Sequence, residues 1–124
     1  LYASHDVFCL PSIERTEAFG IVLLEAMRLG LPCIVTDVPG SGMKWVIGGM
    51  HSDTSSGFVV PPGDPLALSH LLQELADDRG KLSPLRMRAR TRFQSMFDMS
   101  SCARMLTQVY ETTVRTKLTE ADDC

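Results

Sequence analysis

Short apolar runs and stretches of helical periodicity alternate along the chain. Three apolar runs are bounded by Pro or Gly. The first two predict buried parallel strands, and the third predicts a further strand. These runs lie at residues 6–10, 32–36 and 57–60. Helices are indicated at residues 19–28, 43–47, 81–97 and 101–117, in addition to one that follows the third strand. The alternation is typical of a doubly wound, Rossmann-like parallel α/β sheet flanked by helices.

Such sheets usually carry about five or six strands, and the pattern accounts for only part of one. We therefore interpret residues 1–117 as an incomplete C-terminal domain whose remaining strands are expected upstream of Leu1. The acidic residues 118–124 predict a disordered tail.

The helix after the third strand is the most clearly specified. Asp64 is placed as its N-cap and Pro65 as its first residue. Its predicted buried face comprises Leu68, Leu71, Leu72 and Leu75. The last helix carries a similar apolar stripe of Cys102, Met105, Leu106, Val109 and Tyr110.

Residues 17–27 read EAFGIVLLEAM, an apolar run bracketed by two acids. In open α/β sheets, ligands bind beyond the carboxyl ends of the strands, and the loop 12–20 leaves one such end to enter a helix. Free amides of Gly20, Ile21 and Val22 would point out of the helix start, with the positive end of its dipole behind them. This arrangement predicts a metal-free site for a phosphate or diphosphate.

Glu25 lies about five residues into this helix, roughly 7 Å along its axis. That is about the span from a diphosphate to its ribose, and a carboxylate there can accept hydrogen bonds from two ribose hydroxyls. Glu17 precedes the helix, where a transferred group would sit. From spacing alone, a buried amphipathic helix with two solvated glutamates is the more common explanation.

Three segments together resemble glycosyltransferase family 4, a family of retaining enzymes with the GT-B fold. They are Pro11-Ser12, the stretch 17–27 with its E-x(7)-E motif (Glu17 and Glu25), and residues 30–35. Residues 57–65 are similar to the G-x-x-V-P-P-G-D segment of that family. The resemblance continues through Phe93 and Phe97 to about Tyr110, and it implies the C-terminal half of a GT-B glycosyltransferase.

The resemblance also implies a function. It implies a UDP- or GDP-sugar donor, hexosyl transfer with retention to a polysaccharide, glycolipid or other glycan, and no metal or other cofactor. Glu17 would contact the donor sugar and support the transition state as the catalytic residue, and Glu25 would contact the ribose. The remaining donor-binding positions implied are Ser12, Phe19, Gly20, Ile21 and Val22.

The chain departs from the family pattern at two points. Many members carry Gly-Gly-x-x-Glu after the second strand, but residues 39–46 read PGSGMKWV and lack the acid, which leaves the role of the loop Pro39–Met43 open. The basic residues that bind donor phosphates and the acceptor-binding N-terminal domain are expected upstream of Leu1. We therefore expect the isolated segment to be inactive.

Composition narrows the classes of partner and compartment. The net charge of −3 gives no general attraction to nucleic acid, and no apolar run approaches the length of a membrane span. We expect a cytoplasmic protein, with the inner face of the membrane as an alternative site of action.

The four cysteines have no metal-ligand spacing and indicate inert thiols. A basic segment, residues 79–92, indicates a solvated helix or, alternatively, contact with a membrane surface or the upstream domain.

Two other functions fit the same residues. One is a non-catalytic module that binds nucleotide-sugars, and the other is a related GT-B nucleotide-sugar epimerase, against which the Glu17, Phe19-Gly20 and Glu25 pattern argues. Met43 and Trp45 are interpreted as packing residues, with contact to a donor base or sugar as the alternative. Arg15 and Lys44 are weak candidates for phosphate contacts.

Overall fold

Three parallel strands form the sheet of the molecule. The computed structural model describes residues 2–51 and 53–122, with side chains described to residue 116. The strands are β1 (Phe8–Leu10), β2 (Cys33–Thr36) and β3 (Gly57–Val60), in the spatial order β1-β2-β3. The register aligns Cys9 with Ile34 and Ile34 with Phe58. The predicted partial doubly wound sheet is confirmed.

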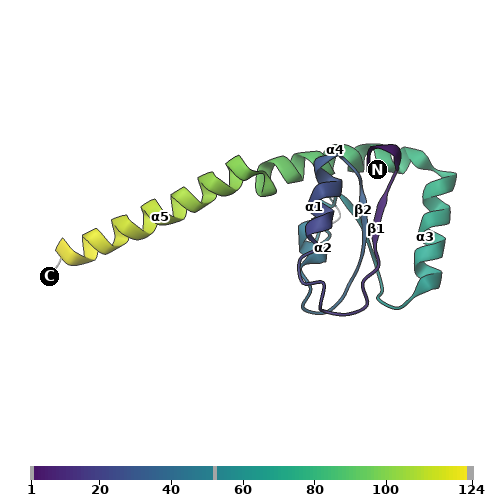
Figure 1. Cartoon of the computed structure of the whole chain (residues 1–124), viewed down its shortest axis with the longest axis horizontal. Helices are drawn as coiled ribbons and strands as arrows, with labels where there is room; N and C mark the ends of the chain where they lie inside the picture. The colour runs from purple at the N-terminus through teal and green to yellow at the C-terminus, as the bar shows by residue number, and fades with distance from the viewer. Residues whose placement is uncertain (1, 52, 123–124) are drawn as a thin grey trace.

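Helices cover both faces of this sheet. They are α1 (Ile21–Arg28), α2 (Met43–Val46), α3 (Pro65–Asp77), α4 (Leu82–Arg92) and α5 (Met99–Asp122). Helices α1 and α2 lie on one face and α3 on the other, while α4 crosses the end at which the strands begin (Figure 1). The loops that leave the three strands therefore gather at the opposite, carboxyl end of the sheet, where α/β folds place their ligands.

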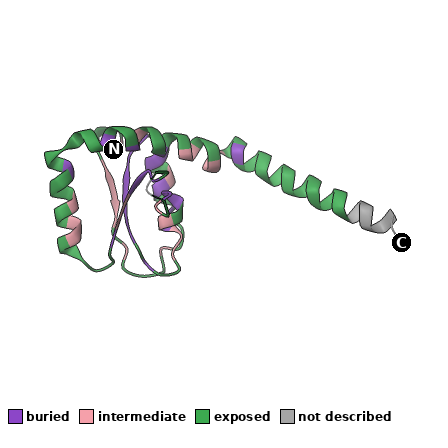
Figure 2. Cartoon of the chain, turned by 180° about the vertical axis from the view of Figure 1, so that it is seen from behind, coloured by how far each residue is buried: buried purple, intermediate pink, exposed green. Residues whose placement is uncertain are grey.

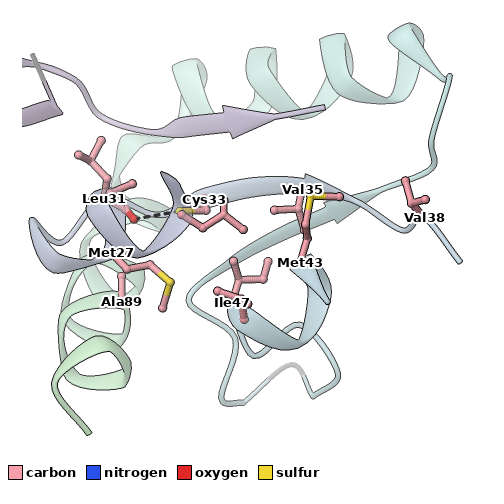
Figure 3. Packing of buried hydrophobic residues seen from close by; sticks show 11 residues of the cluster. Met27, Leu31, Cys33, Val35, Val38, Met43, Ile47 and Ala89 are labelled. Carbon is pink, nitrogen blue, oxygen red and sulfur yellow. Dashed lines mark hydrogen bonds between the residues drawn. The ribbon is translucent and has the colours of Figure 1, made fainter. Parts of the chain in front are cut away.

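The core forms two layers because side chains of β2 alternate between the faces. Cys33 and Val35 pack with Met27 of α1 and with Met43 and Ile47 around α2 (Figure 3). On the other face, Ile34 packs with Val60, Leu75 and Leu82. Burying one such side chain contributes about 1.5–3 kcal/mol to stability. The buried residues lie on both sides of the sheet and along the inner face of α4 (Figure 2).

Local sequence signals set two of the helix boundaries. The Asp64 carboxylate accepts a hydrogen bond from the Ala67 amide at 2.9 Å, and Pro65 follows it as the first helical residue, as predicted. Helix α1 ends in a Schellman motif, in which Gly30 has φ 74°. The Gly30 amide donates to the Met27 carbonyl at 2.9 Å, and the Leu31 amide donates to the Ala26 carbonyl at 3.0 Å.

Other expectations require correction. Strand β1 is only half-buried rather than buried, because it is an edge strand of the described sheet. Helix α1 begins at Ile21, not Phe19. Leu72 is exposed, whereas Leu68, Leu71 and Leu75 pack in the core on the α3 side of the sheet. The helix predicted at 81–97 is divided into a 3-10 turn (Arg79–Lys81), α4 and a π-helical turn (Phe93–Phe97).

Helix α5 is longer than predicted and stands away from the body of the molecule (Figure 1). It continues to Asp122, where a disordered tail was expected, and residues 123–124 lie outside the described residues. Its apolar stripe is exposed, with Val109 at 61% and Tyr110 at 64%. No helix in the described part of the chain is long and apolar enough to cross a membrane.

The basic side chains of residues 79–92 form ion pairs and hydrogen bonds with other parts of the molecule. Arg79 and Arg86 both pair with Asp6 before β1, at 3.2 and 2.7 Å, and Lys81 pairs with Glu74 of α3. The other three arginines donate to backbone carbonyls of Ser55 (from Arg88), of Leu29 (from Arg90), and of Trp45 and Val46 (from Arg92). The segment 79–92 therefore contacts five other parts of the fold through its basic side chains.

Candidate functional site

The start of helix α1 lies at the carboxyl end of the sheet and is shaped by Gly20. This residue adopts a left-handed conformation (φ 76°, ψ 64°), which glycine reaches without the strain of a side chain. A Cβ atom at this position would lie 2.8 Å from Cδ1 of Leu23 and 3.3 Å from Cδ2 of Leu10, so there is no room for one. Both the backbone conformation and the packing therefore require glycine.

The first turn of α1 presents hydrogen-bond donors. Its first amide with a described partner is that of Leu23, which donates to the Gly20 carbonyl at 2.9 Å. Within the described residues, no partner accepts from the amides of Ile21 and Val22, and Gly20 has no side chain with which to cap them. These amides and the helix dipole give the turn a positive potential that suits an anion.

Glu17 is half-buried in the loop between β1 and α1, and the loop after β2 holds its backbone in place. The Ser41 hydroxyl donates to the Glu17 carbonyl at 2.9 Å, and the Gly42 amide donates to the Ala18 carbonyl at 2.6 Å. A Cβ at Gly42 would lie 3.0 Å from the Ala18 oxygen, so this close approach requires a small residue. The Pro39–Met43 loop, whose role the sequence left open, therefore supports the segment that carries Glu17.

Phe19 belongs to an aromatic cluster with Trp45 and Phe97. The ring centroids are 6.4 Å apart for Phe19 and Trp45, 6.2 Å for Phe19 and Phe97, and 5.7 Å for Trp45 and Phe97. The π-helical turn brings Phe97 to this position. Phe19, predicted as a donor-binding residue, thus packs against two other aromatic rings and keeps 39% of its surface exposed.

Arg92 completes this cluster. Its guanidinium carbon lies 5.7 Å from the centroid of the Trp45 ring and 5.9 Å from that of Phe97. Arg92 also donates to the carbonyls of Trp45 and Val46, at 2.6 and 2.7 Å, at the end of α2. Burial lowers the pKa of this arginine below its usual value. Trp45 therefore packs as predicted, and Met43 is fully buried in the core.

The remaining candidates lie at the same end of the sheet. The Ser12 carbonyl accepts a hydrogen bond from the Thr36 hydroxyl, which ties the end of β1 to the end of β2. The Arg15 side chain lies over Gly40, where a Cβ would come within 2.9 Å of its Nε atom. Lys44 forms an ion pair with Asp37 at 2.8 Å, so it has a partner within the fold.

Glu25 is exposed on α1 and avoids the cost of burying a carboxylate. The Tyr2 hydroxyl donates to its Oε2 atom at 2.9 Å. This hydrogen bond is the main reason that the pKa of Tyr2 is raised. The sequence did not point to Tyr2, because an aromatic residue 23 positions away has no periodic relation to the helix.

A cavity of about 190 Å³ opens at the ends of the three strands, on the side of α3. Pro11, Thr36, Val60 and Pro65 are among its lining residues, and none of the predicted site residues lines it in the described chain. Nor is there, within the described residues, a group of His, Cys, Asp and Glu side chains that could hold a metal ion.

The described cysteines are free thiols. Cys33 is fully buried, and burial raises its pKa to about 12. Burial also raises the pKa of Cys9. Since the thiolate is the reactive form, both residues are poor nucleophiles, in agreement with the predicted inert role. Cys124 lies outside the described residues.

A helix start with open amides beside a half-buried glutamate, at the carboxyl end of a parallel sheet, is the arrangement of a ligand-binding α/β domain. Comparison with known families is more specific. The chain belongs to the family described as glycosyl transferases group 1, which matches residues 1–93.

Curated relatives carry glycosyltransferase names. The O-antigen chain mannosyltransferase C of Escherichia coli is 33% identical over 107 residues, covering 86% of this chain and 28% of that protein. The phosphatidyl-myo-inositol mannosyltransferase of Mycobacterium leprae is 35% identical over 109 residues, covering 88% of this chain and 27% of that protein. The chain therefore spans less than a third of the length of these relatives.

Solved structures of GT-B glycosyltransferases have the same fold. The sucrose-phosphate synthase of Thermosynechococcus elongatus has a TM-score of 0.74 and 29% identity, covering 93% of this chain and 27% of that one. Anabaena HepE in complex with UDP-glucose has a TM-score of 0.73 and 22% identity, covering 90% of this chain and 29% of that one. The chain is thus part of a GT-B glycosyltransferase fold.

Proposed function

We propose that this chain provides the donor site of a retaining, family 4 glycosyltransferase that transfers a hexose from a UDP- or GDP-sugar to a glycan or glycolipid. The observation that carries the proposal is the start of α1. There, Gly20 leaves the amides of Ile21 and Val22 open, immediately after the loop that carries Glu17. A diphosphate is the part of the donor that suits these amides.

The chemistry follows from this placement. When the bond between the anomeric carbon of the donor sugar and the diphosphate breaks, negative charge develops on the leaving diphosphate. Amides and a helix dipole that already point at that charge stabilise it more in the transition state than in the ground state. Glu17 would contact the sugar and support positive charge at the anomeric carbon. Positioning and electrostatics then carry the reaction, without a nucleophile from the protein.

The names of relatives support this choice of donor and acceptor. Several relatives are named mannosyltransferases of O-antigen, lipopolysaccharide core or phosphatidyl-myo-inositol, which are glycans or glycolipids. HepE, which shares the fold, is described in complex with UDP-glucose and with UDP. Because this chain spans less than a third of its relatives' length, we also propose that acceptor contacts and further phosphate ligands belong to the remaining part of such an enzyme.

The test is a transfer assay on the complete polypeptide that contains this chain. Labelled UDP- and GDP-hexoses are supplied with and without a glycan or glycolipid acceptor, and the anomeric configuration of the product is read by NMR. Transfer with retained configuration supports the proposal. Epimerised nucleotide-sugar without acceptor, or binding without turnover, would replace it with the epimerase or the binding module.

Substitution of the two glutamates should then affect different kinetic parameters. Glu25→Ala should mainly weaken donor binding, by about tenfold or more, because it removes a charged partner of the ribose hydroxyls. Glu17→Ala should mainly lower kcat, because its contact strengthens in the transition state. Unchanged kinetics in both variants would remove this site assignment.

A further inference from the structure

Tyr2 is the residue that contacts Glu25 from outside α1. Its hydroxyl donates to Oε2 of Glu25 at 2.9 Å, from a 3-10 turn that precedes β1 (Tyr2–Ser4). The Tyr2 ring meets the Phe8 ring edge-on, with centroids 5.7 Å apart, and packs against the core. Tyr2 is therefore held by the body of the domain, whereas Glu25 projects from an exposed position on a helix.

This contact restricts a side chain that would otherwise be mobile. A free glutamate samples several rotamers, and fixing them costs conformational entropy when a ligand binds. A packed tyrosine has few rotamers, so its hydroxyl can hold one carboxylate oxygen at a fixed place. A hydrogen bond with a charged acceptor is also stronger than a neutral one. The conformational entropy of the Glu25 side chain is thus already reduced in the ligand-free protein, so ligand binding loses less of it.

The contact also favours the protonated form of the Tyr2 hydroxyl. The hydrogen bond to Glu25 raises the pKa of Tyr2, because loss of the proton would place two negative oxygens side by side. The raised pKa keeps the Tyr2 hydroxyl protonated, so it remains a hydrogen-bond donor to Glu25. A carboxylate that accepts from Tyr2 through one oxygen retains the other for a hydroxyl of a ligand.

We propose that Tyr2 is a positioning residue that holds Oε2 of Glu25 and leaves Oε1 for the hydroxyls of a nucleotide ribose. This inference rests on the proposed function, in which Glu25 is the ribose-binding acid. It adds a determinant of specificity: the site should prefer ribose over 2′-deoxyribose nucleotides, and the hydroxyl of Tyr2 should contribute to that preference.

The test is Tyr2→Phe in the complete polypeptide that contains this chain. Phenylalanine keeps the ring and its contact with Phe8 and removes only the hydroxyl. Dissociation constants of UDP and 2′-deoxy-UDP, and of GDP and 2′-deoxy-GDP, are measured by calorimetry. The affinity for the ribonucleotide should fall about fivefold, as expected for the weakening of one hydrogen bond. The deoxynucleotide should lose less, so the preference for ribose shrinks.

The chain offers a matched control in its other tyrosine, Tyr110. Tyr110 is exposed on α5, so Tyr110→Phe removes an equivalent hydroxyl far from Glu25 in sequence and should leave all four affinities unchanged. Thermal unfolding of both variants shows whether either substitution disturbs the fold. Retained stability with a reduced preference for ribose supports a positioning role.

Other outcomes overturn the inference. An equal loss for ribose and deoxyribose nucleotides would mean that Tyr2 is only structural, and tighter binding of UDP or GDP would mean that it competes with the ribose. If Glu25→Ala weakens binding but Tyr2→Phe changes nothing, the inference fails while the proposed function stands. If the unsubstituted polypeptide binds neither UDP nor GDP, both fail.

Discussion

At the residue scale, the two acids of the 17–27 stretch have different surroundings. Glu17 is half-buried in a loop whose backbone is fixed by Ser41 and Gly42, and Glu25 is exposed on a helix and hydrogen-bonded to Tyr2. These different surroundings are compatible with the different roles that we propose for the two residues. Gly20 lies between them and sets the start of the helix on which both roles depend.

The importance of Gly20 can be measured as stability. Gly20→Ala should lower the free energy of unfolding by about 2–4 kcal/mol, because a left-handed alanine costs about 1–2 kcal/mol and overpacking against Leu23 adds about 1–2. Gly63→Ala is the matched control. Gly63 also has a positive φ (71°), but nothing lies within 4 Å of its Cβ position, so only the backbone cost of about 1–2 kcal/mol applies.

Urea unfolding of the two variants provides this measurement. The difference between them isolates the packing contribution at the start of α1. Equal losses in both variants would show that Gly20 is required for its conformation alone, and a neutral Gly20→Ala would contradict the described geometry.

At the element scale, local chemistry explains what the sequence could predict. Strand β3 and the start of α3 were predicted correctly because Pro and Asp caps act within a few residues. The helix predicted at 81–97 was only partly correct. Gly80 and Pro84 are local signals that fit the separate turn before α4, but no local signal marks the change to a π-helical turn at Phe93. The half-buried state of β1 depends on strand order, which no local pattern records.

The same reasoning applies to the site. Gly20 and the two acids lie in one short stretch, so their spacing could be interpreted on a helix. Tyr2 and the Phe19, Trp45 and Phe97 cluster come from distant segments, and only the folded chain brings them together. The packing of Phe19 against Trp45 and Phe97 could not be predicted from the sequence for this reason.

Arg92 links three elements, and its removal should be costly. Arg92→Met should lower the free energy of unfolding by about 2 kcal/mol, because it removes the side-chain donor to the carbonyls of Trp45 and Val46 and the cation beside the Trp45 ring. Arg88→Met is the control, since Arg88 is exposed and makes one longer contact, at 3.5 Å to Ser55. Its cost should stay within about 0.5 kcal/mol.

The only tryptophan of the chain, Trp45, reports on this unfolding directly by its fluorescence. A shift in emission of the folded Arg92→Met variant would show that the aromatic cluster has rearranged. A cost as small as that of Arg88→Met would mean that the contacts of Arg92 do not hold α2 to α4.

At the scale of the whole molecule, the fold concentrates polar groups at one end of the sheet. Loops 11–20 and 37–42 are tied together there, the start of α1 opens beside them, and α4 closes the opposite end (Figure 1). Helix α5 leaves this body with an exposed apolar stripe. The part of the molecule that is ordered for ligand chemistry is thus the carboxyl end of the strands.

The central claim is that the start of α1 binds the diphosphate of a nucleotide. The most direct measurement compares the affinities of uridine, UMP and UDP, and of the guanosine series, for the complete polypeptide that contains this chain, with amide signals followed by NMR. We expect UDP or GDP to bind at least about tenfold more tightly than its nucleoside, with the largest shifts at Gly20, Ile21 and Val22. Equal affinities for nucleoside and diphosphate, or shifts confined to other segments, would contradict the account.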